Sequence, residues 1–222
     1  MKPAHPSWWD PHSNQPFKLD RSQKSRFHAA NLNEYLRTGI STATLLPVIA
    51  YRYATSTASK PPPLTEFVGL GISPDHGDHN AIGDLVDELG VIRLLLRVPS
   101  WHIDQLEYYL GFAQRFSNCE ILVNILQCRQ SVIDPESWLR AVDSIITAFS
   151  PLTHEFQIGN AINRSKWGCR HTGEYLDLLD GINDLRDRRP DLILAGSSVI
   201  DFEPLATFRT LVNGHHYHLD AC

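Results

Sequence analysis

FQIGNAINRSKWG, residues 156–168, joins a short apolar strand to a loop that is rich in polar side chains. Its first part, Glu155 to Gly159, has the character of a buried strand. In α/β proteins, the loop at the carboxyl end of a strand is where ligands bind. Amides and cations hydrogen-bond to hydroxyl groups, and an indole ring packs on the C–H face of a sugar. The stretch therefore predicts a carbohydrate-binding loop, with these residues as contacts: Asn160, Asn163, Lys166 and Trp167.

The chain around this stretch repeats a strand-then-helix pattern from residue 64 onward. Six apolar runs are typical of strands: Phe67–Ile72, Val91–Val98, Glu120–Leu126, His154–Gly159, Leu192–Gly196 and His215–Leu219. Between them, apolar residues recur at helical spacing in four stretches: Ala81–Leu89, Ile103–Phe116, Ser137–Phe149 and Glu174–Arg188. This alternation, with continuously apolar strands, predicts a parallel sheet that is buried on both faces.

The spacing of the strands favours a (β/α)8 TIM-type barrel over a doubly wound sheet. The six strands recur at intervals of about 25 to 37 residues. No complete G-x-G-x-x-G follows the first strand, where residues 69–74 hold only part of that spacing. A complete barrel takes about 250 residues. We therefore predict an α/β fold over residues 64–222, an incomplete (β/α)8 barrel of about six βα units whose open edges favour self-association.

Residues 1–63 differ in composition and predict a separate N-terminal extension. They are rich in Pro, Ser, His and Lys and end in the stiff linker signature of residues 56–63. We expect residues 1–30 to be mostly disordered and one or two helices to lie between Ala29 and Ala54. The apolar stretch 40–53, interrupted by Pro47, suits a helix docked on the domain. The alternative is peripheral contact with a membrane surface.

Composition excludes several classes of protein. A net charge of −5 and a pI near 6.1 argue against a nucleic-acid partner. Four cysteines without a C-x-x-C pair indicate reduced thiols rather than disulfides or a zinc cage. The first ten residues lack the pattern of a signal peptide, and no 18-residue apolar run is present. We expect a cytoplasmic protein, at most peripheral to a membrane, without a cofactor.

Three short motifs lie at the ends of expected strands. Arg97-Val98-Pro99 ends the second strand, Gly159-Asn160-Ala161-Ile162-Asn163 follows the fourth, and His215-His216-Tyr217 lies on the sixth. In this order they resemble the Arg-x-Pro, Gly-Asn-Glu and His-x-Tyr of clan-A glycoside hydrolases, the retaining (β/α)8 family of many cellulases and mannanases. The resemblance covers about residues 64–220. It implies O-glycosyl hydrolysis, with these substrate contacts: Arg97, Asn160, His215 and Tyr217.

Two departures from that family put catalysis in doubt. Ala161 stands where the family has its acid/base Glu, and we expect the strand that carries the nucleophile to be missing. Retaining hydrolysis needs two carboxyl groups about 5 to 5.5 Å apart. Asp201, after the fifth strand, and Asp220, after the sixth, are the candidate catalytic replacements. The chain is thus predicted to act on or bind a glycan or glycoconjugate, or alternatively to be an inactive module in polysaccharide or cell-envelope assembly.

Two further groups of polar residues complete the candidates. Gln127 and Arg129 alternate onto one face after the third strand and can reach a substrate hydroxyl. The histidines of residues 215–218, together with those of residues 76–79, raise the alternative of a metal-dependent barrel hydrolase. Because the first strand carries no ligand residue, ordinary core or rim histidines are the favoured interpretation. No metal ligand is assigned.

Overall fold

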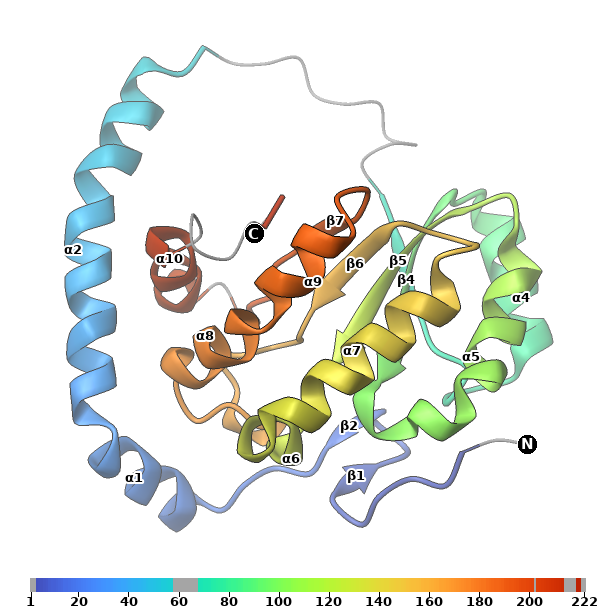
Figure 1. The fold of residues 1–222 in the computed structure, drawn as a ribbon, viewed down its shortest axis with the longest axis horizontal. Coiled ribbons are helices and arrows are strands. Elements are labelled where there is room, and N and C mark those ends of the chain that lie inside the picture. The colour runs from blue at the N-terminus through green and yellow to red at the C-terminus, as the bar shows by residue number, and fades with distance from the viewer. Residues whose placement is uncertain (1–2, 58–67, 202, 214–218, 221–222) are drawn as a thin grey trace.

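The computed structural model describes residues 3–57, 68–201, 203–213 and 219–220, and a parallel sheet lies at its centre (Figure 1). Its strands are β3 (Leu70–Ile72), β4 (Arg93–Pro99), β5 (Glu120–Leu126), β6 (Glu155–Ile158) and β7 (Ile193–Ala195). They lie side by side in that order, and each neighbouring pair is parallel. The predicted α/β class with a parallel sheet is confirmed.

Closure into a barrel is not shown, because the five strands of the described residues form an open sheet with β3 and β7 at its edges. The sequential strand order is that of consecutive βα units, so the sheet agrees with the predicted topology at this coarser level. The sixth predicted strand, His215–Leu219, lies outside the described residues except for Leu219.

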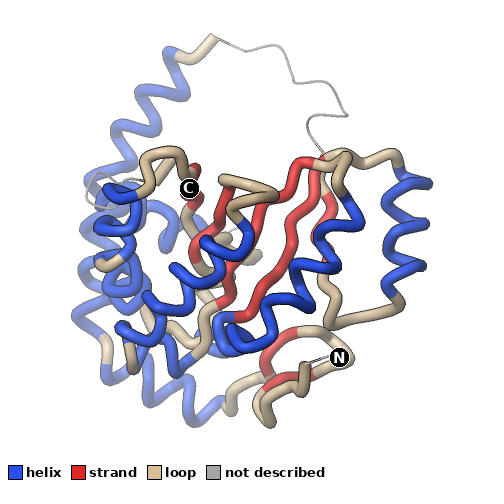
Figure 2. Tube along the Cα trace, turned by 45° about the vertical axis from the view of Figure 1, so that its right-hand side comes forward, coloured by secondary structure: helices blue, strands red, loops and turns tan. Residues whose placement is uncertain are grey.

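Helices follow the strands and lie along one face of the sheet (Figure 1, Figure 2). They are α4 (His79–Leu89), α5 (Leu106–Ala113), α6 (Arg129–Ile133), α7 (Pro135–Phe149), α8 (Thr172–Asp180), α9 (Ile182–Arg188) and α10 (Pro204–Asn213). Three short 3₁₀ helices are η1 (Ser100–Gln105), η2 (Gln114–Phe116) and η3 (Ser165–Trp167). Asp134 caps α7 by accepting from the Ser137 N–H at 3.0 Å, and Pro135 occupies the first turn.

One predicted helix, Glu174–Arg188, is divided at Gly181 into α8 and α9. A Cβ atom at Gly181 would collide with the side chain of Leu139 on α7. The glycine therefore lets the chain pass close to α7, and the backbone bends there. Hydrophobic periodicity continues through residue 181, which is why the sequence predicted a single helix.

The two faces of the sheet differ, which corrects the prediction of apolar burial on both. Leu94, Leu96 and Val98 of β4 pack into the same core as Trp138 of α7. The other face carries a polar row that runs across the strands. Arg97 is paired with Asn124, and Asn124 with Gln157. The sequence did not predict this difference between the faces, because only one polar residue interrupts the apolar run of each strand.

The N-terminal segment is ordered where residues 1–30 were predicted to be mostly disordered. It contains a two-stranded antiparallel hairpin, β1 (Trp9–Asp10) and β2 (Gln15–Pro16), and two helices, α1 (Arg21–Ala30) and α2 (Leu32–Thr55). Trp9 is only 3% exposed and packs in one cluster with Ala161 and Trp167. Burial of this large aromatic ring contributes to ordering the segment, and the polar average composition of residues 1–30 does not reveal it.

Helix α2 confirms a helix between Ala29 and Ala54, and Pro47 lies within it. It packs along α10 (Figure 1), and Arg209 of α10 contacts Glu34 of α2 at 2.7 Å. Residues 40–53 include exposed apolar side chains: Ile40, Leu46, Val48, Ile49, Tyr51 and Tyr53. Peripheral membrane contact through this stretch stays a prediction. Within the described part of the chain, no helix has the length and apolar character needed to cross a bilayer.

Candidate functional site

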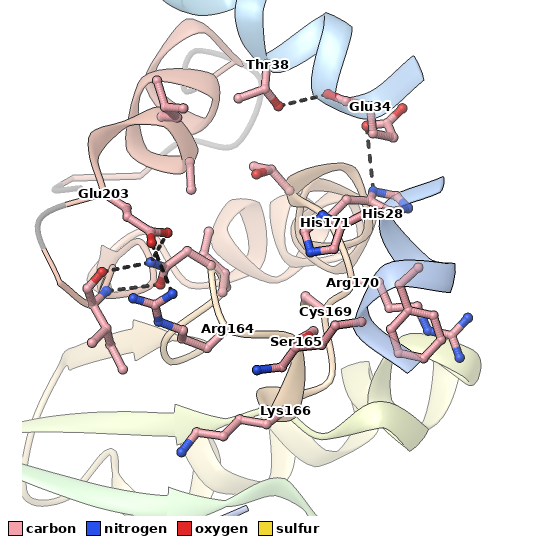
Figure 3. A pocket seen from close by; sticks show the side chains of 18 of the residues that line it. His28, Glu34, Thr38, Arg164, Ser165, Lys166, Cys169, Arg170, His171 and Glu203 are labelled. Atoms are coloured by element: carbon pink, nitrogen blue, oxygen red, sulfur yellow. Dashed lines mark hydrogen bonds and ion pairs between the residues drawn. The ribbon is translucent and has the colours of Figure 1, made fainter. Parts of the chain in front are cut away.

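A cavity of about 890 Å³ lies beside the carboxyl ends of β6 and β7 (Figure 3). We call it the β6–β7 pocket. Three segments line it: residues 15–38 of the N-terminal segment, residues 162–172 after β6, and residues 200–206 after β7, of which residue 202 is not described. Loops at this edge of a parallel sheet are the usual place for a ligand. Among the predicted site residues, the pocket is lined by Asn163, Lys166 and Asp201.

The loops after β6 and β7 are held together by Asn163 and Arg164. The Asn163 amide donates to the Ile200 carbonyl at 2.8 Å and to Glu203 at 2.9 Å, and its oxygen accepts from the Ile200 N–H at 3.0 Å. Arg164 forms ion pairs with Asp201 and, at 3.0 Å, with Glu203 (Figure 3). These bonds fix one wall of the pocket and engage both carboxylates of the β7 loop.

Lys166 lies in η3 and meets the N-terminal hairpin. Its Nζ donates to Gln15 Oε1 at 2.6 Å. Burial lowers the pKa of Lys166, and the nearby charges of Lys18 and Lys24 lower it further. Besides burial, neighbouring cations thus disfavour the charged form of Lys166.

The Arg97 side chain is enclosed by aromatic rings instead of facing the pocket. Its guanidinium lies 5.2 Å from the ring centroid of Trp167 and 5.8 Å from that of Trp9. Nη1 donates to the Asn14 carbonyl at 3.0 Å, and the buried Nη2 has no hydrogen-bond partner among the described residues. Burial lowers the pKa of Arg97 to about 10. Trp167, only 3% exposed, is thus covered by the N-terminal hairpin rather than open to a ligand.

Asn160 and Gln127 shape the β6 loop from within. The Gln127 amide donates to the Asn160 carbonyl at 2.8 Å, and the Asn160 N–H donates to Gln127 Oε1 at 2.7 Å. Ser198 donates to Asn160 Oδ1 at 3.1 Å. Gln127 is fully buried. Because these polar groups are engaged with one another, they position the loop and do not line the pocket.

The surroundings of Ala161 and Asp220 do not favour acid/base chemistry. Ala161 is fully buried with φ of 49°, within the same cluster as Trp9. Asp220 accepts from the Leu194 N–H at 2.8 Å, in the middle of β7, and pairs with Arg186 at 2.5 Å. The hydrogen bond from Arg186 lowers the pKa of Asp220, which favours the charged form and opposes proton donation.

Other predicted contacts lie outside the described residues. His215 and Tyr217 belong to the segment 214–218, as do His216 and His218 of the metal alternative, whereas its His76 and His79 are described. Within the described part of the chain, no group of three His, Cys, Asp or Glu side chains is arranged to hold a metal ion. Arg129 donates to Glu174 at 2.7 Å and to the Gly168 carbonyl at 3.0 Å, which is a structural role.

A buried polar group near Arg97 has partners that sequence reasoning missed. Asp75 is 3% exposed, and its carboxylate accepts from the Tyr109 hydroxyl at 2.9 Å. The His102 ring lies 2.6 Å from the same hydroxyl and 3.3 Å from the Ala4 carbonyl. Asp75 follows β3 in the chain. No local pattern marks its partners, because they come from η1, α5 and the N-terminal segment.

We expect His102 to make the protein less stable at low pH. Burial lowers the pKa of His102 below its usual value near 6.5. Between pH 7 and pH 5 the unfolded chain therefore binds a proton before the folded protein does, and the free energy of unfolding falls. Urea denaturation of wild type and His102→Asn across this range measures the effect. The variant should show a shallower pH dependence, and an unchanged slope would contradict the expectation.

Comparison with known proteins leaves the geometry of this site to be interpreted on its own. No protein-family model matches the chain, and no curated protein matches it. The arrangement of amide, cation and carboxylate groups around the β6–β7 pocket is therefore the basis for a functional conclusion.

Proposed function

We propose that this protein binds a glycan or glycoconjugate in the β6–β7 pocket, as a glycoside-hydrolase-like domain in which Ala161 stands at the position of the acid/base Glu. The observation that carries the proposal is the pocket itself. It joins Asn163, Lys166 and the acids of the β7 loop at the carboxyl edge of a parallel sheet. Amides, cations and carboxylates together suit the many hydroxyl groups of a sugar.

The size and walls of the pocket support this class of ligand. A volume of about 890 Å³ is within the range of small-molecule sites, about 300 to 1,000 Å³. Apolar side chains also line it: Phe27, Tyr35, Ile162 and Leu205. A sugar presents both a hydroxylated rim and a C–H face, so a cavity with both polar and apolar walls matches it.

Binding is favoured over hydrolysis by the condition of the candidate acids. Asp201 is ion-paired with Arg164, and its side chain is 68% exposed. A general acid needs a site that favours its protonated form. The carboxylate of Asp201 is engaged by Arg164, and the Arg186 pair of Asp220 favours the charged form of Asp220. Catalysis by Asp201 or Asp220 stays a prediction, tested by turnover of aryl glycosides with Asp201→Asn as the comparison.

Replacing Asn163 should weaken glycan binding. Asn163→Ala removes the hydrogen bonds that join the two loops, so we expect about a tenfold loss of affinity, the equivalent of one hydrogen bond. A glycan array with the full chain identifies a ligand, and isothermal titration calorimetry measures it against wild type.

Asn80→Ala is the matched control, since Asn80 lies at the start of α4, outside the pocket. Circular dichroism confirms that both variants fold. If wild type binds no glycan on the array, the proposal is lost. Equal affinity of wild type and Asn163→Ala for the identified glycan would place the binding site elsewhere.

A further inference from the structure

The β6–β7 pocket carries more positive than negative charge, although the chain as a whole has a net charge of −5. Five cationic side chains are among its described lining residues: Lys18, Lys24, Arg164, Lys166 and Arg170. Three carboxylates are also present: Glu34, Asp201 and Glu203. An acidic protein that gathers cations in one cavity creates a local field that attracts anions.

The carboxylates of the pocket do not neutralise these lysines. Asp201 and Glu203 are both paired with Arg164. Glu34 contacts Arg209 at 2.7 Å and Arg37 at 2.8 Å, and these two arginines do not line the pocket. Among the described residues, the remaining four cations of the pocket have no ion pair within 4 Å. They are therefore available to an acidic ligand.

Lys166 shows where an anionic oxygen would lie. Gln15 Oε1 already occupies a hydrogen-bonding position 2.6 Å from Nζ. A neutral carboxamide oxygen satisfies the geometry of this bond but not the charge. A carboxylate or phosphate oxygen in its place would form a charge-assisted hydrogen bond, roughly twice as strong as a neutral one.

Arg170, four residues after Lys166 in the chain, is held in a fixed orientation. Its guanidinium lies 4.1 Å from the ring centroid of Phe27, which stacks on it. A stacked guanidinium loses little further freedom when it binds, and its planar fork matches the two oxygens of a carboxylate or phosphate group. Figure 3 shows Arg170 and Lys166 on neighbouring parts of the β6 loop. The loop thus offers an anionic ligand both the ammonium group of Lys166 and the planar fork of donors of Arg170.

We propose that the ligand of the β6–β7 pocket is an acidic glycan, one whose sugar units carry carboxylate or phosphate groups. The inference rests on the proposed glycan-binding function and specifies its chemistry. The walls shaped by Asn163 and by the apolar side chains contact the sugar, while Lys166 and Arg170 each bind an anionic group. Lys18 and Lys24, both exposed at the mouth, raise the local concentration of the ligand through longer-range attraction.

Calorimetric titration of the full chain with matched ligands tests this inference. A tetragalacturonate is compared with a neutral galactose tetrasaccharide, and a hexose phosphate with the free hexose, in about 20 mM salt. We expect each acidic ligand that binds to do so at least tenfold more tightly than its neutral partner. The advantage should shrink at about 0.5 M salt, where screening is strong. Whichever acidic ligand binds identifies carboxylate or phosphate as the natural group.

Two charge-neutralising variants locate the effect. Lys166→Gln and Arg170→Gln should each reduce affinity for the acidic ligand about tenfold, a larger loss than either causes for the neutral ligand. Arg140→Gln, an exposed position on α7 outside the pocket, is the control and should bind as wild type does. Thermal unfolding verifies that the variants are folded, and if one does not fold the other gives the answer.

The outcomes separate this inference from the proposed function. Equal affinity for acidic and neutral glycans would overturn the acidic class and leave glycan binding in place. If neither acidic nor neutral glycans bind, both proposals fall. Acidic preference that persists undiminished in both variants would show that the anion is bound elsewhere.

Discussion

Replacing Gly168 by alanine is expected to destabilise the protein by about 4 kcal/mol, the sum of a strained backbone and a steric clash. Gly168 has φ of 107°, a conformation that residues with a Cβ atom rarely adopt. A Cβ atom there would lie 2.5 Å from the Cys128 carbonyl carbon and 2.6 Å from its oxygen. The neighbour is backbone, so it cannot rotate away. Such a loss is a large part of the 5 to 15 kcal/mol of a typical domain.

Urea denaturation followed by far-ultraviolet circular dichroism measures the change, with Gly111→Ala as the matched control. Gly111 lies in α5 and is exposed, and a Cβ atom there would meet nothing within 4 Å. The control should be unchanged or up to about 1 kcal/mol more stable, because alanine favours a helix. Equal stability of Gly168→Ala and wild type would show that the β6 and β5 loops do not approach as described.

Truncating Trp9 is expected to cost about 3 to 5 kcal/mol, the usual penalty for removing a buried tryptophan. Trp9 is 3% exposed, and its ring centroid lies 5.7 Å from that of Trp167 and 5.3 Å from that of Trp101. Trp9→Ala leaves a cavity over the sheet edge and removes one of the rings around Arg97. The N-terminal segment therefore contributes to the stability of the domain that follows it.

Trp8→Ala provides the comparison, because the two residues are adjacent but differ in burial. Trp8 is 38% exposed and contacts Trp101 edge to face. Its removal should cost only about 1 kcal/mol. Unfolding is followed by circular dichroism so that loss of a fluorophore does not confuse the result. If both variants lose the same stability, residues 3–16 are not anchored through Trp9.

Much of the α/β framework was predictable because it depends on local periodicity. The strand beginning at Glu120 and the helix ending at Phe149 lie where apolar spacing places them. The hairpin of residues 9–16 was not predictable. Its polar, proline-containing sequence indicates disorder, and the partners that order it are distant in the chain. No sequence pattern near Gly181 predicts the break between α8 and α9, because the break depends on contact with Leu139 of another helix.

The candidate site was predictable only as a location. The loop after β6 does line the pocket, and Asn163 and Lys166 lie there as expected. Sequence position alone could not distinguish them from Asn160 and Trp167, which lie in the same loop but bond or pack internally. That distinction depends on which distant segment covers each side chain. Here Gln127 hydrogen-bonds to Asn160, and the N-terminal hairpin covers Trp167.

The contact between Gln15 and Lys166 joins residues that are 151 positions apart in the chain. On a ribosome that adds about 5 to 20 residues per second, the hairpin is made roughly 8 to 30 seconds before its partner exists. During synthesis, the Trp9 ring therefore has no native surface to cover it. The pocket wall can therefore assemble only after the β6 loop has emerged from the ribosome. A protease added to stalled nascent chains should cut within residues 3–16 until Lys166 has emerged.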